Sequence, residues 1–591
     1  MVKKKWMIAS KRADFKGIGQ ALGIDPVLVR IMRNRDLTDP EEMRRWLYGD
    51  LNSLHDPHLL KDIDKAAEII LHHIKIGSRI MIANDFDCDG ISAGFILKTA
   101  LKRIGADVYV DTPDRITDGY GINVRMVEDA AARGTGLIIT CDNGIAAMEA
   151  ADKADELGIE LIITDHHEVP YEELPDGGRR YILPRAAAVV DPKQTDCPYP
   201  FDGICGAVVA FKLMQVVYEK SAGAVPNQMF TYLEIAAMAT VADVMQLKDE
   251  NRILVKYGLE RMKHTDNKGL QALMEATQIR PERLSAYHIG FIIGPCLNAS
   301  GRLSTAQKAI SLLEEKDYQQ ALIKARELKD LNDQRKDMTQ QGVDQARDLV
   351  EASMTDRKVL VIPLKDCHES IAGIIAGRIR EIYNRPVIVL TDTGTGYKGS
   401  GRSIPAYNMF ERVSETRSLL SRFGGHAMAC GLSLPYENLE TFSDQLEEGC
   451  GLTDKDLVPV VNLDLQLPVR YLTEPFIESL DMLAPYGMGN PKPLFAEKDL
   501  SVSEIRIMGQ NRNVLKLRLR DNTGWPVEAI YFGDIPQFEE MIREKYGDQA
   551  LQAMYLARPN PARLLIAYEP EINEFRGSRT IQLELKHIDV Q

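Results

Sequence analysis

Acidic and imidazole side chains gather in four short stretches of the chain, most of which directly follow an apolar run. The stretches are "NDFDCDG" (84–90), "TCDNG" (140–144), "TDHHEVP" (164–170) and "TVADV" (240–244). The side chains that could bind metal or transfer protons are Asp85, Asp87, Asp89, Asp142, Asp165, His166, His167 and Asp243. So many carboxylates at one place would repel one another strongly unless divalent cations neutralised them. Mixed carboxylate and imidazole ligands suit Mn²⁺, with Mg²⁺ or Zn²⁺ as alternatives.

Two such cations, roughly 3.5–4 Å apart, stabilise the attacking and leaving oxygens of a phosphoryl transfer. The predicted chemistry is therefore metal-dependent hydrolysis of a phosphate ester. The alternative is structural, because a single aspartate at the end of a strand is usually a helix cap or a turn residue. Four clusters in similar positions favour the metal site over that alternative.

The elements that must position these side chains are short strands. Apolar runs that each end in an acid occupy 79–85, 106–111, 136–142, 160–165 and 187–191. Helical stretches separate most of them. This alternation predicts a parallel sheet covered on both faces. In such sheets ligands bind beyond the carboxyl ends of the strands, which is where the acids fall.

The rest of the chain predicts three further parts. Residues 205–330 are mainly helical in pattern, and 315–350 is a charge-dense run typical of a long bridging helix of about 50 Å. A second α/β unit follows, with strands at 358–364 and 385–392 around a helix at 368–383. From about 455 the pattern is β-rich, and the alternation of "NVLKLRLR" (513–520) predicts a small antiparallel barrel. The fold class is two α/β domains joined by a long helix, plus a C-terminal barrel.

Composition limits the possible partners and location. The net charge of −14 argues mildly against nucleic acid, unless a local basic patch exists. The polar face of 513–520, with Lys516, Arg518 and Arg520, is a candidate patch. The eight cysteines form no CxxC pair, which favours free thiols in a reducing cytosol. No run of about 18 apolar residues occurs and the N-terminus lacks a leader's apolar core, so we expect a cytoplasmic protein without membrane spans.

The four acidic stretches, in this order, resemble the metal motifs of the DHH phosphoesterase superfamily. Other stretches resemble, within it, the RecJ family of single-strand-specific DNA exonucleases. These stretches are "PDRITDGYGIN" (113–123), "GPCLNASGRL" (294–303), "GSGRSIPAYNMFE" (399–411), "RFGGHAMACGLSL" (422–434) and "APYGMGNPKPLF" (484–495). The resemblance extends from about residue 45 to the end of the chain.

The resemblance implies a domain order. It predicts an N-terminal helical segment (1–50), a DHH catalytic domain (51–320), a connecting helix (321–352), a DHHA1 substrate-binding domain (353–452) and an OB-like nucleic-acid-binding domain (453–591).

The resemblance also implies roles at the metal site. Two Mn²⁺ or Mg²⁺ ions would be held by Asp87, Asp89, Asp142, His166 and Asp243. His167 would contact the scissile phosphate, and Asp165 would orient an imidazole. Several superfamily members carry a histidine where this chain has Ala83, and Asp85 could supply the missing ligand. The predicted catalytic residues are His167, Asp142 and Asp85.

Substrate contacts are implied at the other motifs. Ser400, Arg402 and Arg115 would bind a 5′ phosphate, with 396–403 as a glycine-rich anion-binding loop. The further contacts implied are Tyr120 near the terminal base, Arg302 on the backbone, Asn298 and His426. A tight turn with a surface arginine, and a buried structural His426, are the alternatives. His368 is either a helix cap or a substrate contact. The chain departs from the family pattern at Cys88, commonly Ala, and at Cys296, commonly Arg.

The function implied is 5′→3′ exonuclease activity on single-stranded DNA, releasing nucleoside 5′-monophosphates in repair and recombination. The partners implied are single-stranded DNA with a 5′ end, a helicase and a single-strand-binding protein. A DHH nanoRNase or cyclic-dinucleotide phosphodiesterase, or a pyrophosphatase, would share the chemistry but lack the C-terminal barrel. A non-catalytic DNA-binding scaffold would have lost the acids that this chain retains.

Overall fold

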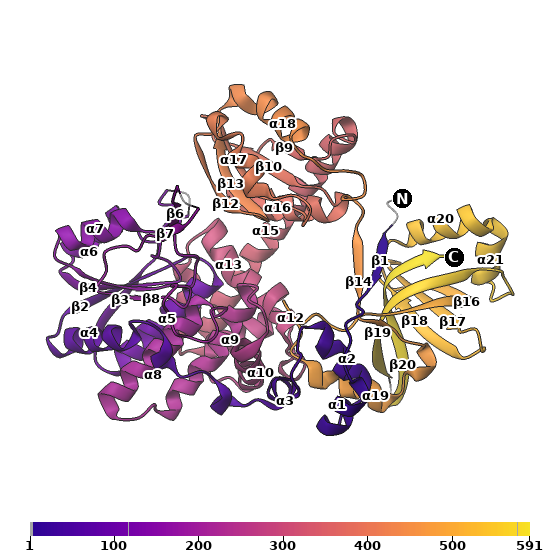
Figure 1. The fold of residues 1–591 in the computed structure, drawn as a ribbon, viewed down its shortest axis with the longest axis horizontal. Helices are drawn as coiled ribbons and strands as arrows, with labels where there is room; N and C mark the ends of the chain where they lie inside the picture. The colour runs from indigo at the N-terminus through magenta and orange to yellow at the C-terminus, as the bar shows by residue number, and fades with distance from the viewer. Residues whose placement is uncertain (1–3, 116, 176, 576) are drawn as a thin grey trace. The chain divides into compact units, whose positions relative to one another are not determined.

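The computed structural model describes residues 4–115, 117–175, 177–575 and 577–591, which form two compact units (Figure 1). The first, called here the α/β unit, comprises 55–245 and 254–459. The second, called the barrel unit, comprises 4–54, 246–253 and 460–591.

The first sheet of the α/β unit is fully parallel, with the strand order β3-β2-β4-β5-β8. Its strands are β2 (Arg79–Asn84), β3 (Asp107–Asp111), β4 (Thr135–Cys141), β5 (Glu160–Thr164) and β8 (Ala188–Val190). One face is covered by α6 (Val124–Ala132) and α7 (Met148–Glu156), and the other by α4 (Ile63–Lys75), α5 (Cys88–Arg103) and α8 (Gly206–Ala222). The predicted doubly covered parallel sheet is confirmed. A small hairpin of β6 (Tyr171–Glu173) and β7 (Arg179–Tyr181) leaves it after β5.

A helical layer follows the sheet and ends in a helix of 36 residues, α15. The helices are α9 (Leu233–Ala242), α10 (Asp249–Lys263), α11 (Lys268–Ala276), α12 (Ala286–His288), the π-helix η5 (Ile289–Ile293), α13 (Gly294–Leu303), α14 (Gln307–Glu314) and α15 (Tyr318–Ser353). Helix α15 packs against α11 and α13 and then against α16 (Glu369–Tyr383) of the second sheet, so it joins the two α/β parts.

The second sheet has the order β12-β13-β11-β10-β9, and only β9 and β10 run parallel. Its strands are β9 (Leu360–Leu364), β10 (Val387–Asp392), β11 (Tyr397–Arg402), β12 (Arg422–His426) and β13 (Ala429–Leu434). Helices α15 and α16 cover one face, while α17 (Met409–Ser414) and α18 (Leu439–Glu448) cover the other.

The prediction of a glycine-rich loop at 396–403 is wrong. Most of this segment is strand β11, which pairs with β10 and β13. Its glycines meet packing needs instead of a turn. A Cβ at Gly399 would lie 2.6 Å from Leu390 Cδ2, and one at Gly401 would lie 2.6 Å from Cys430 Sγ. Both glycines therefore let the neighbouring side chains close over the strand.

The barrel unit closes into a five-stranded barrel, because β16 pairs with both β17 and β19 in the order β16-β17-β18-β20-β19. The strands are β16 (Phe495–Met508), β17 (Val514–Arg520), β18 (Pro526–Tyr531), β19 (Arg563–Phe575) and β20 (Ser578–Val590), with a short β15 (Leu465–Gln466) beside β16. Strands β18 and β20 run parallel. Helices α19 (Glu474–Leu480), α20 (Ile535–Tyr546) and α21 (Asp548–Tyr555) accompany it. The predicted fold class, including the C-terminal OB-like barrel, is confirmed.

The N-terminal segment belongs to this barrel unit. Strand β1 (Lys5–Ile8) pairs in parallel with β14 (Val460–Leu463). Helices α1 (Phe15–Leu22), α2 (Pro26–Asn34) and α3 (Pro40–Tyr48) place Leu28, Met32 and Trp46 in the same core as the barrel residues Leu515 and Phe538. No helix in the described part of the chain is long and apolar enough to cross a membrane.

Candidate active site at the carboxyl edge of the first sheet

The first acidic cluster lies where β2 ends and α5 begins. Asp87 caps α5, and its carboxylate accepts hydrogen bonds from the N–H groups of Asp89 (2.9 Å) and Gly90 (3.1 Å). Glycine is needed at 90 because a Cβ there would lie 2.6 Å from the Asp85 carbonyl oxygen. Buried Asp85 and Asp89 flank this cap, so the stretch presents three carboxylates within one turn of the chain.

Asp89 is fixed by the start of a second helix. Its two carboxylate oxygens accept hydrogen bonds from Gly206 N (2.7 Å) and Ala207 N (2.8 Å), at the first residues of α8. N–H groups at a helix N-terminus stabilise an anion. Gly206 also allows close approach, because a Cβ there would lie 2.7 Å from that of Asp142.

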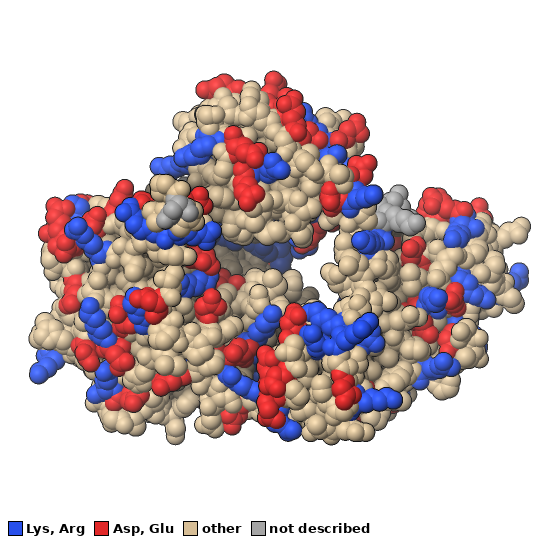
Figure 2. All heavy atoms as spheres, in the orientation of Figure 1, with Lys and Arg blue, Asp and Glu red and all other residues tan. Residues whose placement is uncertain are grey.

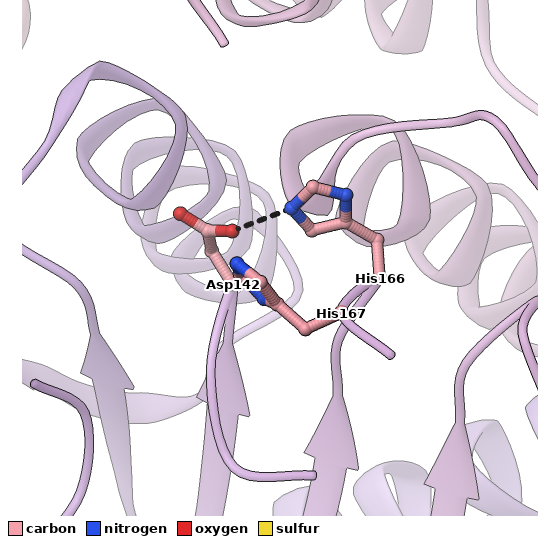
Figure 3. Close-up of side chains that lie close together, drawn as sticks. All are labelled: Asp142, His166 and His167. Atoms are coloured by element: carbon pink, nitrogen blue, oxygen red, sulfur yellow. Dashed lines mark hydrogen bonds and ion pairs between the residues drawn. The ribbon is translucent and has the colours of Figure 1, made fainter. Parts of the chain in front are cut away.

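The second and third clusters meet at Asp142 and His166 (Figure 3). Asp142 follows β4 with a positive φ of 62°, and His166 follows β5. The His166 Nε2 lies 3.0 Å from Asp142 Oδ1, 3.6 Å from Asp89 Oδ2 and 3.7 Å from Asp243 Oδ2. Burial lowers the pKa of His166, which favours the neutral imidazole that a metal requires.

The neighbouring ring, His167, has different surroundings. Its Nδ1 lies 2.7 Å from Asp165 Oδ1, and the Tyr120 hydroxyl is 3.3 Å from the ring. Burial alone would lower the pKa of His167, but the hydrogen bond to Asp165 and its charge raise that pKa to about 9. The Tyr120 hydroxyl donates to the Asp142 carbonyl oxygen at 2.7 Å. His167 is thus a half-exposed cation at neutral pH, beside the carboxylates.

Three groups of ligand atoms emerge from the described residues, and two of them share no residue. Their ligand atoms lie within 4.8 Å of one another in each group. One group is Asp85, Asp87 and Asp142; the other is Asp89, His166 and Asp243. Asp142, which belongs to the first, also forms the third group with His166 and His167, so it lies beside the second. The arrangement suits two cations side by side.

The buried carboxylates repel one another, and a bound cation would neutralise this repulsion. Burial first, and then the neighbouring carboxylates, raise the pKa values of Asp85, Asp87 and Asp142, and they raise that of Asp243 to about 8. The buried Asp85 Oδ1 has no hydrogen-bond partner among the described residues. Oxygen ligands with one imidazole are a donor set for Mn²⁺ or Mg²⁺.

A cluster of guanidinium groups lies next to these acids. Arg115 packs over the Phe86 ring at 4.5 Å and is near Asp85 and Asp87. Arg302 lies near both Arg115 and Arg402, and burial followed by those two charges lowers its pKa to about 10. Arg402 donates to Ser400 Oγ at 3.2 Å. Figure 2 shows Lys and Arg side chains in a hollow of the α/β unit, whereas acids and bases intermingle elsewhere on that face. Clustered cations of this kind bind phosphate.

The remaining residues predicted to contact the substrate lie in different structural surroundings. Asn298 Oδ1 accepts a hydrogen bond from Cys88 N at 2.6 Å, so it anchors the metal loop to α13. His368 caps α16 by accepting from Ser370 N at 3.3 Å. His426 is exposed on the β12–β13 hairpin, which contradicts the buried alternative. The Arg302 guanidinium donates to the Ser370 carbonyl oxygen, which links α13 to that helix.

The two departures from the family pattern are both buried. Burial and the charges of Asp87 and Asp89 raise the pKa of the Cys88 thiol, so it stays neutral. The Cys296 Sγ accepts a hydrogen bond from Asn332 Nδ2 at 3.5 Å. Arg335 donates to the same Asn332 side chain at 3.1 Å and lies near Arg302. An arginine from α15 therefore stands close to the position where the family commonly has one.

Sequence reasoning missed Asn143. Its Oδ1 accepts from Ile122 N at 3.0 Å, and its Nδ2 donates to the carbonyls of Ala83 and Cys141. It therefore holds the loop of Tyr120 against the ends of β2 and β4. The sequence signal for Asn143 is its position directly after Asp142, although an asparagine after a strand is usually interpreted as a turn residue.

The basic face predicted on the barrel is partly neutralised. Leu515, Leu517 and Leu519 are buried as expected. Lys516 pairs with Glu528 at 2.7 Å, and Arg518 pairs with Glu504 at 3.3 Å. These glutamates come from adjacent strands, which the sequence of β17 alone does not show.

The fold and site define a class of protein: a DHH-type phosphoesterase with a DHHA1 domain and an OB barrel. Residues 79–240 match the DHH family N-terminal domain, 356–451 match the DHHA1 domain, and 463–587 match the RecJ OB domain.

The chain belongs to the RecJ family. It is 35% identical over 589 residues to the single-stranded-DNA-specific exonuclease RecJ of Bacillus subtilis, covering 99% of this chain and 70% of that one. It is 32% identical to RecJ of Escherichia coli, covering 96% of both chains. It is also similar to the crystal structure of RecJ from Thermus thermophilus with Mn²⁺, with a TM-score of 0.81, 27% identity, and coverage of 99% of this chain and 79% of that one.

Proposed function

We propose that this protein is a single-stranded-DNA-specific exonuclease that starts at a 5′ end and releases nucleoside 5′-monophosphates. The observation that carries the proposal is the pair of ligand groups that meet at Asp142, next to the Arg115, Arg302 and Arg402 cluster. The family relatives carry this activity in their names. Bound Mn²⁺ or Mg²⁺ would activate water and stabilise the charge that develops on phosphorus.

The chain's own residues supply the rest of the chemistry. We propose Asp87, Asp89, Asp142, His166 and Asp243 as ligands, with Asp85 completing the first group. His167 carries a proton at neutral pH because of Asp165, so it would donate a charged hydrogen bond to the scissile phosphate. Ser400, Arg402 and Arg115 would hold the terminal 5′ phosphate, and Tyr120 would contact the first base. Asn298 holds Cys88 N through its Oδ1, and its Nδ2 would contact the strand.

We place this activity in the cytoplasm, in DNA repair and recombination. An enzyme restricted to single strands needs ends exposed by unwinding, so a helicase and a single-strand-binding protein are the expected partners. The small-substrate phosphodiesterases and the scaffold are not favoured, because the chain has the OB barrel and keeps every acidic cluster.

The test is product analysis. Uniformly labelled single-stranded DNA, incubated with Mn²⁺, should yield nucleoside 5′-monophosphates, and a chelator should abolish the release. If long strands stay intact while dinucleotides or cyclic dinucleotides are hydrolysed, the protein is a small-substrate phosphodiesterase. Binding of DNA without metal-dependent release would identify a scaffold.

A further inference from the structure

Two large aromatic side chains on the surface of the α/β unit lie face to face. Tyr287 is 62% exposed and Phe291 is 67% exposed. Their ring centroids are 4.9 Å apart and their planes differ by 28°. They sit where α12 passes into the π-helix η5, and π-helical turns occur frequently at functional sites. Solvent exposure of adjacent apolar rings marks a binding surface.

The helix that carries Phe291 is fixed against the metal site. A Cβ at Gly294 would lie 3.0 Å from Ala242 Cβ, the neighbour of Asp243. One turn later, Asn298 accepts its hydrogen bond from Cys88 N. A Cβ at Gly301 would lie 2.3 Å from the Phe86 carbonyl oxygen. Residues 289–303 therefore run directly along the acidic clusters.

Five of the accessible positions in this segment form one stripe. Tyr287 and Phe291 are exposed, and Pro295, Asn298 and Arg302 are half-buried, at spacings of four, four, three and four residues. Such spacing places side chains on one helix face. At 1.5 Å per residue, Phe291 lies about 16 Å from Arg302 along the helix. Arg302 belongs to the guanidinium cluster, so the stripe joins that cluster to the aromatic pair.

We propose that Tyr287 and Phe291 form a stacking platform for a base of the single strand, a few nucleotides to the 3′ side of the scissile phosphate. This proposal rests on the proposed function and adds a binding site to it. Every base offers an aromatic face, so stacking holds the strand without reading its sequence. A base inside a duplex has both faces covered by its neighbours. The platform therefore also favours single strands over duplex DNA.

The test compares a Tyr287→Ala/Phe291→Ala double variant with a matched control, Tyr171→Ala/Tyr181→Ala. The control removes another exposed aromatic pair of the same unit, whose rings are 5.9 Å apart. Fluorescence anisotropy of a labelled single-stranded 20-mer, with metal chelated, should show affinity about fivefold or more weaker for the platform variant. The control should bind like the wild type. Phe291→Trp should retain the affinity, and Phe291→Leu should lose part of it.

Two further readouts separate this proposal from the proposed function. 2-Aminopurine placed at successive positions from the 5′ end should be quenched at one internal position in the wild type and not in the platform variant. Dinucleotide hydrolysis should be equal in both, because a dinucleotide does not reach the platform; equal rates also show that the active site is folded. If the wild type degrades single strands and the platform variant binds and degrades them equally well, the platform proposal is wrong. If the wild type does not degrade single strands, the proposed function itself fails.

Discussion

Asp142 belongs to the first ligand group, and its Oδ1 lies 3.0 Å from His166 Nε2 of the second. Its neutral replacement, Asp142→Asn, removes one negative charge from the first group and puts a neutral amide beside His166. Indirect supports of metal sites cost about 10–100-fold when removed, so loss of this ligand should lower DNA cleavage by about 100-fold or more. The measurement is the rate of nucleotide release at saturating Mn²⁺.

Asp191 provides the matched control for that variant. It is also a buried acid at a strand end, with a pKa raised to about 7 by burial, but it accepts from Lys193 N and belongs to neither ligand group. Asp191→Asn should cleave DNA at close to the wild-type rate. Equal losses in the two variants would mean that any buried acid at this edge matters, and not the ligand groups.

Proton release should accompany metal binding. Burial and mutual repulsion raise the pKa values of Asp85, Asp87 and Asp142, and they raise that of Asp243 to about 8, so at pH 7 the metal-free protein holds protons in this cluster, with Asp243 mostly protonated. A cation requires the carboxylates to be ionised, and therefore its binding must expel those protons. Apparent Mn²⁺ affinity should rise from pH 6 to pH 8. Calorimetry in two buffers of different ionisation enthalpy measures the release; a heat independent of buffer would contradict it.

Sequence patterns predict Asp142 and His166 as candidate ligands because each follows an apolar strand, whereas Asp243 ends helix α9. The pattern could not assign Asn298 or Arg335, because their roles depend on contacts with residues distant in the chain. Asn298 meets Cys88, 210 residues earlier, and Arg335 lies on a helix that sequence alone identifies only as a connector.

Helix α16 and strand β11 meet through a glycine. A Cβ at Gly373 would lie 2.7 Å from Arg402 Nη2 and 2.8 Å from Ser400 Oγ. Gly373→Ala should therefore push the Arg402 side chain aside and weaken the preference for a 5′-phosphorylated end over a 5′-hydroxyl end. The measurement is the ratio of cleavage rates for the two ends, which we expect to fall severalfold.

One turn along the same helix, Gly377 has no described atom within 4 Å of its Cβ position. Gly377→Ala should leave the ratio unchanged and should stabilise the helix by about 1 kcal/mol, since alanine is the better helix former. A drop in the ratio for both variants would indicate a general effect on α16 and not displacement of Arg402.

Elements with a regular hydrophobic pattern could be predicted from the sequence. Elements whose packing partners are distant in the chain could not. The strands at 79–191 are uniformly apolar because both sheet faces are covered, and their bounds agree to within about two residues. The glycines of strand β11 predict a loop, whereas in the structure they allow tight packing between strands. The N-terminal helices carry an ordinary amphipathic pattern, which does not reveal that they complete the core of a barrel more than 400 residues later.

At the scale of the whole molecule, Arg252 is a buried side chain that connects distant segments of the barrel unit. It is 1% exposed, lies 3.4 Å from the Trp46 ring centroid, and donates to the carbonyls of Trp46, Met482, Leu483 and Ala484. Arg252→Met would leave several buried acceptors without donors. We expect a loss of about 3 kcal/mol or more in the free energy of unfolding of this unit.

Tryptophan fluorescence measures that loss selectively. The three tryptophans, Trp6, Trp46 and Trp525, all belong to the barrel unit, so chemical denaturation followed by their emission reports on that unit. The half-exposed Arg543, which donates to Glu539 and Glu540, provides the control, and Arg543→Met should leave the midpoint unchanged. An unchanged midpoint for Arg252→Met would show that the buried guanidinium contributes no net stability.

The central claim is strand degradation from the 5′ end at the paired ligand groups. The most direct measurement incubates single-stranded DNA labelled at its 3′ end with Mn²⁺ and samples it over time, beside duplex DNA and the Asp142→Asn variant. We predict labelled strands that shorten progressively from the 5′ end, intact duplex, and no shortening by the variant. Labelled strands of full length throughout, or immediate release of the 3′ label as a mononucleotide, would contradict the claim.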